Sequence, residues 1–346
     1  MRYYSIIISD PVSGQVYQPD PNGGGFVKGK AGPTFTSYAN GQTIPGALNI
    51  ELDMPVVAFD SPQGNGLVRV WGVGLQMIGQ ASDLSGANIT ISAGMQKGLP
   101  LANPAQAGII VQGSVYQAFG NWQGINQTLD LVVQCSSLAP DNGIAFNWES
   151  GTPLQSALST TLSQAFPNYK QDIKVGGNLQ TPNDSAQIGT YRSLGQFCSY
   201  LRGISQKAGQ PVYGDQYPGV LVTIVGNTIK VYDGTQQQTP VKLAFQDLIG
   251  QPTWINPATV NFKTVLRSDI AVGSTIQFPQ GIVAPFALTS AAAAAPNSPA
   301  RNKTVFQGVF SVVEVHHFAN SRQPDADSWN STFSAVPLPD LTALTS

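Results

Sequence analysis

The chain has two histidines, His316 and His317, the side chains best suited to bind a metal or to transfer a proton near neutral pH. They are adjacent in an apolar run, residues 305–318, that predicts a β-strand, and successive side chains of a strand point to opposite faces. The two rings therefore do not share one metal. Glu314 and His316 share a face and would give two ligands of a site completed by another subunit, whereas such sites need three or four. The alternative is that one ring packs inside the protein and the other lies on its surface.

Nucleophilic catalysis would need a serine or cysteine beside a histidine and an orienting acid. The sequence contains no Gly-x-Ser-x-Gly elbow. With histidine present only as one dipeptide, a catalytic triad would have to be assembled across domains.

A pair of carboxylates is the other catalytic arrangement with few requirements, because glycan hydrolysis needs two acids on either side of a cleft. Four acids near predicted turns are candidates for such a pair: Asp60, Asp83, Asp141 and Glu149. The alternative is that these acids cap turns and interact with solvent, as most turn acids do.

No cofactor is predicted, because the sequence has no Walker loop, no Gly-x-Gly-x-x-Gly between a strand and a helix, and no Cys-x-x-Cys. Cys135 and Cys198 lie far apart, which favours a reducing compartment in which both thiols are small buried hydrophobes. The five tryptophans are dispersed and are interpreted as core or interface anchors instead of sugar-stacking platforms. They are Trp71, Trp122, Trp148, Trp254 and Trp329. We therefore predict no catalytic, cofactor-binding or metal-binding residues.

The 346-residue chain is weakly charged: only 10% of its residues are charged, against a usual share of about 25%, while it has 36 glycines and 25 prolines. Such a surface indicates that partner subunits cover much of the exterior. The net charge of −2 and the lack of a basic run argue against sequence-specific nucleic-acid binding. We also expect no signal peptide and no membrane insertion, because the apolar run at residues 3–8 is short and no stretch reaches about 18 apolar residues.

Short runs with strand character, separated by turn residues, fill the chain to about Trp148 and predict an antiparallel barrel or sandwich. These runs are residues 5–9, 47–52, 56–59, 67–73, 88–93, 109–116 and 128–133. Residues 20–25 predict a hairpin or loop tip, and residues 93–107 an irregular excursion.

The pattern becomes helical at Thr152, a predicted N-cap with Pro153 at the first helical position. Apolar residues at a four-residue interval predict one amphipathic helix, and a second is predicted over residues 190–208 with Gly209 at its C-cap. Their apolar stripes are Leu154, Leu158, Leu162 and Phe166, then Leu194, Phe197, Leu201 and Ile204. Residues 220–225 and 228–232, joined by Gly-Asn, predict a hairpin.

The strand pattern returns after about residue 243, with runs at 258–265, 273–278, 305–318 and 329–335, and the alanine-rich residues 290–299 are predicted to form a loop. The order β, then α+β, then β indicates a duplicated barrel with an inserted middle domain. We predict a first β-barrel over residues 1–148, a middle α+β domain over 149–238, a second β-barrel over 239–336 and a C-terminal tail over 337–346.

Several segments together resemble the two barrels of the baseplate hub proteins of contractile-tailed bacteriophages, the tail-tube-like double-barrel hub family. In that family a glycine-proline strand entry is followed by a strand toward a histidine and a final strand that contains tryptophan. The matching segments are residues 248–253, 260–266, 269–276, 308–317 and 327–333 in the last third of the chain, and 47–53, 89–94 and 108–115 in the first.

The resemblance implies a mainly β fold, with two tail-tube-like antiparallel β-barrels and a small middle α+β domain, assembled as a homotrimer. Such a trimer presents six similar units, and it would join the six-fold tail tube to the three-fold central spike and line the channel for DNA ejection. The implied partners are the tail tube protein, the central spike protein, other baseplate proteins and the tape measure protein. The implied place is the baseplate of a virion assembled in the host cytoplasm, in a protein that is not an enzyme. Two alternatives stay open: a tail-associated enzyme that degrades glycan or peptidoglycan, and a receptor-binding adhesin.

Overall fold

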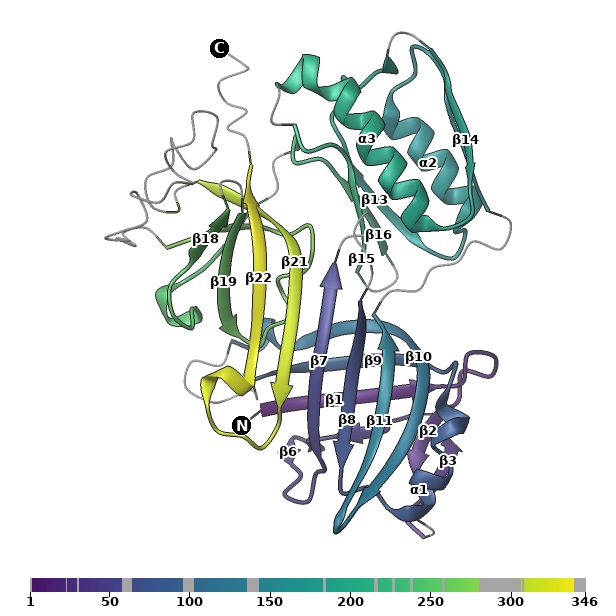
Figure 1. Ribbon diagram of the computed structural model, residues 1–346, viewed down its shortest axis with the longest axis vertical. Helices are drawn as coiled ribbons and strands as arrows, with labels where there is room; N and C mark the ends of the chain where they lie inside the picture. The colour runs from purple at the N-terminus through teal and green to yellow at the C-terminus, as the bar shows by residue number, and fades with distance from the viewer. Residues whose placement is uncertain are drawn as a thin grey trace.

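The computed structural model describes residues 2–22, 24–29, 31–57, 64–95, 103–135, 143–182, 185–214, 217–225, 228–236, 239–256, 259–279, 306 and 308–338. The described chain is mainly β, with one large, mostly antiparallel sheet of 15 strands and a separate α+β unit (Figure 1). Its buried apolar residues form three clusters, one in each half of the large sheet and one in the α+β unit.

The first half of the large sheet is formed by strands from the first 134 residues. Their bounds are β1 (Arg2–Ser9), β2 (Val16–Pro19), β3 (Phe26–Gly29), β4 (Phe35–Thr36), β7 (Asn49–Val57), β8 (Asn65–Trp71), β9 (Asn88–Met95), β10 (Gly108–Gln123) and β11 (Asn126–Gln134). Strands β5 (Tyr38–Ala39) and β6 (Gln42–Thr43) form a separate two-stranded sheet. Helix α1 (Leu75–Gly79) and the 3-10 turn η1 (Ala81–Leu84) connect β8 to β9, and the 3-10 turn η2 (Pro104–Gln106) precedes β10.

The alternation of apolar residues places alternate side chains in the first core, as the sequence predicts. In β1, for example, Tyr4, Ile6 and Ile8 are buried. One prediction needs correction, because residues 47–52 and 56–59 do not form two strands. A continuous strand β7 runs through Pro55 and pairs along that stretch with a strand from the far end of the chain. Phe59 lies outside the described residues.

The second half of the sheet comes from residue 241 onward. Its strands are β17 (Val241–Lys242), β18 (Thr253–Asn256), β19 (Thr259–Val265), β20 (Thr275–Gln277), β21 (Val309–Asn320) and β22 (Trp329–Pro337), with the 3-10 turns η4 (Phe245–Asp247) and η6 (Ala326–Ser328). Its core is rich in aromatic rings, and the Phe262 and Phe333 rings stack at 4.8 Å. The alanine-rich residues 290–299 lie outside the described residues.

The two halves repeat one topology. Within the path of paired strands, the first half runs β7-β8-β11-β10-β9-β1 and the second half runs β18-β19-β22-β21-β20-β17. When these strands are numbered by their order in the sequence, with β2, β3 and β4 of the first half left out, both halves read 2-3-6-5-4-1. One pair differs, since β1 pairs with β9 antiparallel whereas β17 pairs with β20 parallel.

Strand β21 joins the two halves. Its first residues pair with β20, and after a bulge between Val312 and Glu314 its remaining residues pair with β7. The free edge of β7 is therefore used to extend the sheet into the other half. Among the described strands, the pairing does not return on itself to close a barrel.

The α+β unit lies between the two halves in sequence and beside them in space (Figure 1). It holds α2 (Leu154–Ala165), α3 (Leu194–Tyr213), the pair β12 (Ile144–Trp148) with β14 (Gln187–Tyr191), and a three-stranded sheet of β13 (Lys170–Lys174), β16 (Thr228–Tyr232) and β15 (Leu221–Val225). The apolar stripes of both helices are buried in one cluster, as predicted. The three inward side chains of β12 pack in this cluster too, and not in the first core.

Three predicted helix ends need correction. Helix α3 begins at Leu194 with Ser193 as its N-cap, and not at residue 190, which lies in β14. The N-cap of α2 is Pro153, and Thr152 instead donates a hydrogen bond to the Glu149 carbonyl. Helix α3 does not end at Gly209 but continues to Tyr213, and its C-cap is Gly214 with φ of 91°. Gly209 is needed inside the helix because a Cβ there would lie 2.3 Å from the ring of Tyr217. The hairpin of β15 and β16 is confirmed, while its turn residues 226–227 lie outside the described residues.

Candidate functional site

The two histidines lie on opposite faces of β21, as the strand alternation predicts. His316 is exposed and its Nε2 lies 2.5 Å from Oδ1 of Asp53 on the neighbouring strand β7. Glu314, on the same face, accepts a hydrogen bond from the hydroxyl of Ser334. Within the described ranges, no group of three or more His, Cys, Asp or Glu residues could hold a metal ion.

His317 is buried and its Nδ1 lies 2.8 Å from the hydroxyl of Ser331, directly opposite on β22. Burial, and secondly the nearby His316, lower the pKa of His317 to about 3, so the ring is neutral at pH 7. This Ser-His contact was missed by the sequence reasoning, and only the hairpin pairing of β21 with β22 would have indicated it. Ser331 is 0% exposed, so no substrate reaches its hydroxyl. The contact therefore supports packing, not nucleophilic catalysis.

The two candidate acids in the described part of the chain, Asp83 and Glu149, do not lie at one site. Asp83 lies on η1 in the first half of the sheet, where its carbonyl accepts a hydrogen bond from Tyr17. Glu149 follows β12 in the α+β unit and interacts with Asn147. Asp60 and Asp141 lie outside the described residues.

The cysteines and tryptophans are spread over different parts of the fold. Cys135 is buried in the first cluster and Cys198 in the second, and burial raises the pKa of the Cys135 thiol to about 11. Trp148 and Trp329 are buried, whereas Trp122 is exposed near the end of β10. The tryptophans thus do not form a shared sugar-stacking platform.

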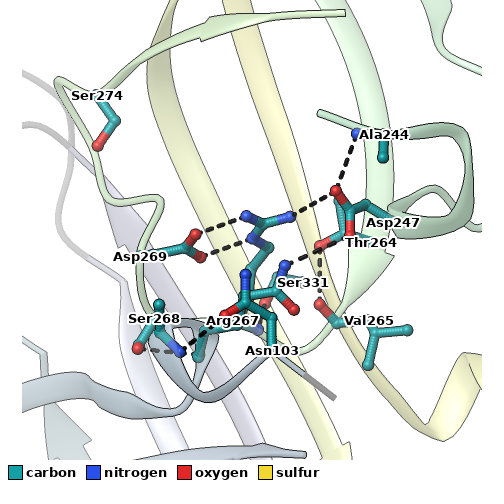
Figure 2. Close-up of polar contacts among 12 residues, drawn as sticks. Asn103, Ala244, Asp247, Thr264, Val265, Arg267, Ser268, Asp269, Ser274 and Ser331 are labelled. Carbon is teal, nitrogen blue, oxygen red and sulfur yellow. Dashed lines mark hydrogen bonds and ion pairs between the residues drawn. The ribbon is translucent and has the colours of Figure 1, made fainter. Parts of the chain in front are cut away.

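The most developed polar cluster surrounds Arg267, whose side chain is 4% exposed (Figure 2). Its Nε and Nη2 donate hydrogen bonds of 2.6 Å to the two carboxylate oxygens of Asp269. Its Nη1 lies 3.5 Å from Asp247 on η4, and that carboxylate accepts a further bond from the backbone N–H of Ala244. The backbone N–H of Arg267 bonds to the Ser331 hydroxyl. A buried guanidinium is stable only with such partners.

This cluster also connects the two halves of the sheet. The carbonyl of Gln106, on η2 in the first half, accepts hydrogen bonds from the backbone N–H and the hydroxyl of Ser268 at 2.8 Å and 3.0 Å. The Gln106 amide donates to Asp247 at 3.4 Å. Sequence reasoning did not single out Arg267, although an arginine two residues before an aspartate, just after a predicted strand, is the local signal. The cluster fixes how the two halves meet and contains no group placed for catalysis.

The first core is completed by the second half of the chain. Leu266, Ala319 and Trp329 are all at most 2% exposed and belong to the first hydrophobic cluster. The two halves therefore form one packed body across the β21–β7 pairing.

Exposed apolar side chains mark parts of the surface that would bury area on assembly. Several lie on or beside the large sheet: Ile109, Tyr116, Phe119, Trp122, Ile125 and Ile255. Among the described residues, no helix has both the length and the apolar character needed to cross a bilayer.

The chain is similar in fold to a chain of the half-lidded PdpA–VgrG complex of Francisella, with a TM-score of 0.50 and 7% identity over 99% of this chain and 59% of that one. Other similar structures are the 43 kDa tail protein of prophage MuSo2 from Shewanella oneidensis (TM-score 0.49, 7% identity, 96% of each chain) and a tail protein from Neisseria meningitidis MC58 (0.47, 8%, 96% of each). No protein-family profile and no curated protein matches the chain. At 7% identity, the likeness to the Francisella chain concerns the fold alone.

Proposed function

We propose that this chain is a structural baseplate hub of a phage or phage-like tail. It forms a homotrimeric ring that joins the six-fold tail tube to the three-fold central spike and lines the channel for DNA ejection. In this proposal, residues 1–148 and 239–336 act as two tail-tube-like barrels, residues 149–238 as a middle domain and residues 337–346 as a tail.

The observation that carries the proposal is the repeated strand order 2-3-6-5-4-1 in two sheet halves joined edge to edge through β21 and β7. A trimer of such chains presents six sheets of one topology around a ring. A ring of this kind offers an equivalent surface to each subunit of a six-fold tube while keeping three-fold symmetry toward a spike. A trimer of chains without the repeat would not offer an equivalent surface to each subunit of a six-fold tube.

Two further features support a structural role over an enzymatic one. The Ser331–His317 contact is enclosed, and the described candidate acids lie on different parts of the fold, Asp83 on η1 and Glu149 after β12. The low charge of the chain is consistent with an exterior largely covered by the tube, the spike, other baseplate proteins and the tape measure protein. The fold likeness to a chain of a PdpA–VgrG complex favours a spike-type partner.

The test is the mass of the purified chain by light scattering, alone and mixed with the tube and spike proteins encoded beside it. The proposal expects a trimer that binds both partners, and three-fold particles with a central opening in electron micrographs. A chain that stays monomeric at high concentration and binds neither partner would overturn it. In a parallel assay on peptidoglycan, clearing that is lost on Asp83→Asn or Glu149→Gln would favour an enzyme instead.

A further inference from the structure

The repeat extends from strand order to individual residues. In the first half, the N–H of Val115 donates to the Ala87 carbonyl at 2.8 Å and its carbonyl accepts from Gly86 at 2.7 Å. In the second half, Val312 makes the same two bonds with Ser274 and Gly273, at 2.9 Å and 2.8 Å. Val115 and Val312 therefore occupy equivalent positions on β10 and β21.

Each of these valines is followed by a bulge. The register of β10 shifts between Val115 and Gln117, and the register of β21 shifts between Val312 and Glu314. Beyond the bulge, Gln117 is thus equivalent to Glu314. Counting onward, Phe119 is equivalent to His316.

Strands β7 and β18 correspond in the same way, as the rows of paired residues across four strands show. The row in the first half is Asp53–Leu67–Val132–Gln117, and the row in the second half is Thr253–Asn261–Ser334–Glu314. Both rows cross the strands in the same order and end at the equivalent residues beyond the bulge. Asp53 is therefore equivalent to Thr253, and Pro55 to Ile255.

The equivalent strands differ in how many neighbours they have. Beyond its bulge, β21 lies between β22 and β7, with His316 opposite Pro55. Beyond its bulge, β10 pairs with β11 on one side. On the other side it pairs with none of the described strands, and the backbone N–H of Ala118 donates a hydrogen bond of 3.2 Å to the Ser85 hydroxyl. Likewise β7 pairs with β8 and β21, whereas β18 pairs with β19 alone among those strands. The chain thus contains one completed junction and the two unmatched halves of a second.

We propose that the outer part of β10, beyond its bulge, pairs antiparallel with β18 of a second copy of this chain, reproducing between chains the β21–β7 junction found within the chain. The proposal rests on the trimeric hub, in which three internal and three intermolecular junctions alternate around the ring. Carried over from the internal junction, the register sets Asn121 opposite Thr253 and Phe119 beside Ile255 of the second copy.

The exposed side chains at these two edges fit the proposal. Phe119 is 39% exposed and Ile255 is 56% exposed, and pairing in this register would bring the two apolar side chains together on one face. At the internal junction the equivalent positions hold His316 and Pro55. An uncovered strand edge with apolar side chains is otherwise prone to aggregation.

The positions of the two edges also fit a ring. In Figure 1, β18 lies at the left of the sheets and β10 lies toward the right, beside α1, so the two strands belong to opposite sides of the chain. Such a head-to-tail contact closes into a ring when its rotation divides a full turn. A second copy is therefore the occupant that the geometry favours.

The test uses the full chain with Phe119→Cys and Ile255→Cys together and a short bis-maleimide cross-linker. The bulge between Trp254 and Asn256 offsets the two positions, and the cross-linker is long enough to span this offset. The native Cys135 and Cys198 are buried and give the background in the parent protein. We expect covalent dimers and trimers on a denaturing gel. Phe119→Cys with Ile188→Cys, an exposed position on β14, is the matched control and should give no more than background.

The outcomes separate the junction from the hub. Covalent trimers that form with Phe119→Cys and Ile255→Cys, and not with the control pair Phe119→Cys and Ile188→Cys, support the junction. A protein that is trimeric by light scattering but is not cross-linked overturns the junction and leaves the hub standing, whereas a monomer overturns both. As a second measurement, Ile255→Lys should lower the trimer association constant about tenfold or more, and Ile188→Lys should leave it unchanged. Equal trimer formation by both lysine variants counts against the junction.

Discussion

The guanidinium of Arg2 lies 5.5 Å from the ring centre of Trp329, so the first strand of the chain contacts the last. Arg2 also donates hydrogen bonds to the carbonyls of Asn320, Gln323 and Asp325, which form the turn between β21 and β22. A residue at the start of the first half of the sheet therefore holds a turn of the second half in place.

We expect Arg2→Ala to loosen this turn, because three carbonyls lose their donor together. The free energy of unfolding should fall by about 1–3 kcal/mol. Hydrogen exchange at residues 320–328 should speed up, with little change in the α+β unit. Arg2→Lys is the matched control: it keeps the charge without the planar fork and should recover only part of the protection. Unchanged exchange in both variants would show that Arg2 does not hold the turn.

Replacing Arg267 should be the more damaging change, since it leaves Asp247 and Asp269 partly buried without their cation. Removing one partner of a buried ion pair costs about 3–5 kcal/mol, and we expect Arg267→Met to approach that loss in urea unfolding. Lys263→Met removes the exposed pair with Asp327 and should cost less than about 1 kcal/mol. Similar losses for the two variants would mean that the Arg267 cluster does not fix the contact between the two halves.

His317 gives the protein a specific pH dependence. Its pKa in the folded protein, about 3, lies below the ordinary value of 6.5, because burial disfavours the charged ring. The unfolded chain therefore takes up the proton first as the pH falls. The stability due to the neutral ring is complete above pH 6.5 and is lost as the pH falls from 6.5 toward 3, by at most about 1.4 kcal/mol per pH unit.

We expect His317→Gln to flatten the decline of urea-unfolding stability between pH 6.5 and 4, whatever its effect at pH 7. His316→Gln, on the exposed face of the same strand, keeps the buried ring and should retain most of the slope. A His317→Gln protein with the parent slope would show that the ring does not stay neutral in the folded state.

The sequence predicted those features that depend on local periodicity. The four-residue spacing from Leu154 to Phe166 and the alternation in β1 are set by which side chains must face a core, and both were confirmed. The pairing of β7 with β21 was not predicted, because Asp53 and His316 on these strands are 263 residues apart and no local pattern specifies the partner of a strand. The contact of Ser331 with His317 was not predicted either, because it depends on the register of the β21–β22 hairpin.

Burial of polar residues was also hidden from the sequence. Arg267 and Asp269 lie in a short stretch that resembles an exposed turn, and only the packing of η2 and η4 around them encloses the guanidinium. The candidate acids were chosen because they lie near predicted turns, and a turn position does not reveal which acids share a cleft. Local sequence predicts where a charge lies along the chain, and not what surrounds it.

Gly209 and Gly203 both lie in α3, and alanine substitutions at these two positions test why the predicted end of the helix was wrong. A Cβ at Gly209 would lie 2.3 Å from the Tyr217 ring, so Gly209→Ala should force the ring to move and cost about 1–3 kcal/mol in thermal unfolding of the α+β unit. A Cβ at Gly203 meets nothing within 4 Å, so Gly203→Ala should stabilise the helix by about 0.5–1 kcal/mol. If Gly209→Ala stabilised the protein as Gly203→Ala does, Gly209 would not be required for the packing of Tyr217.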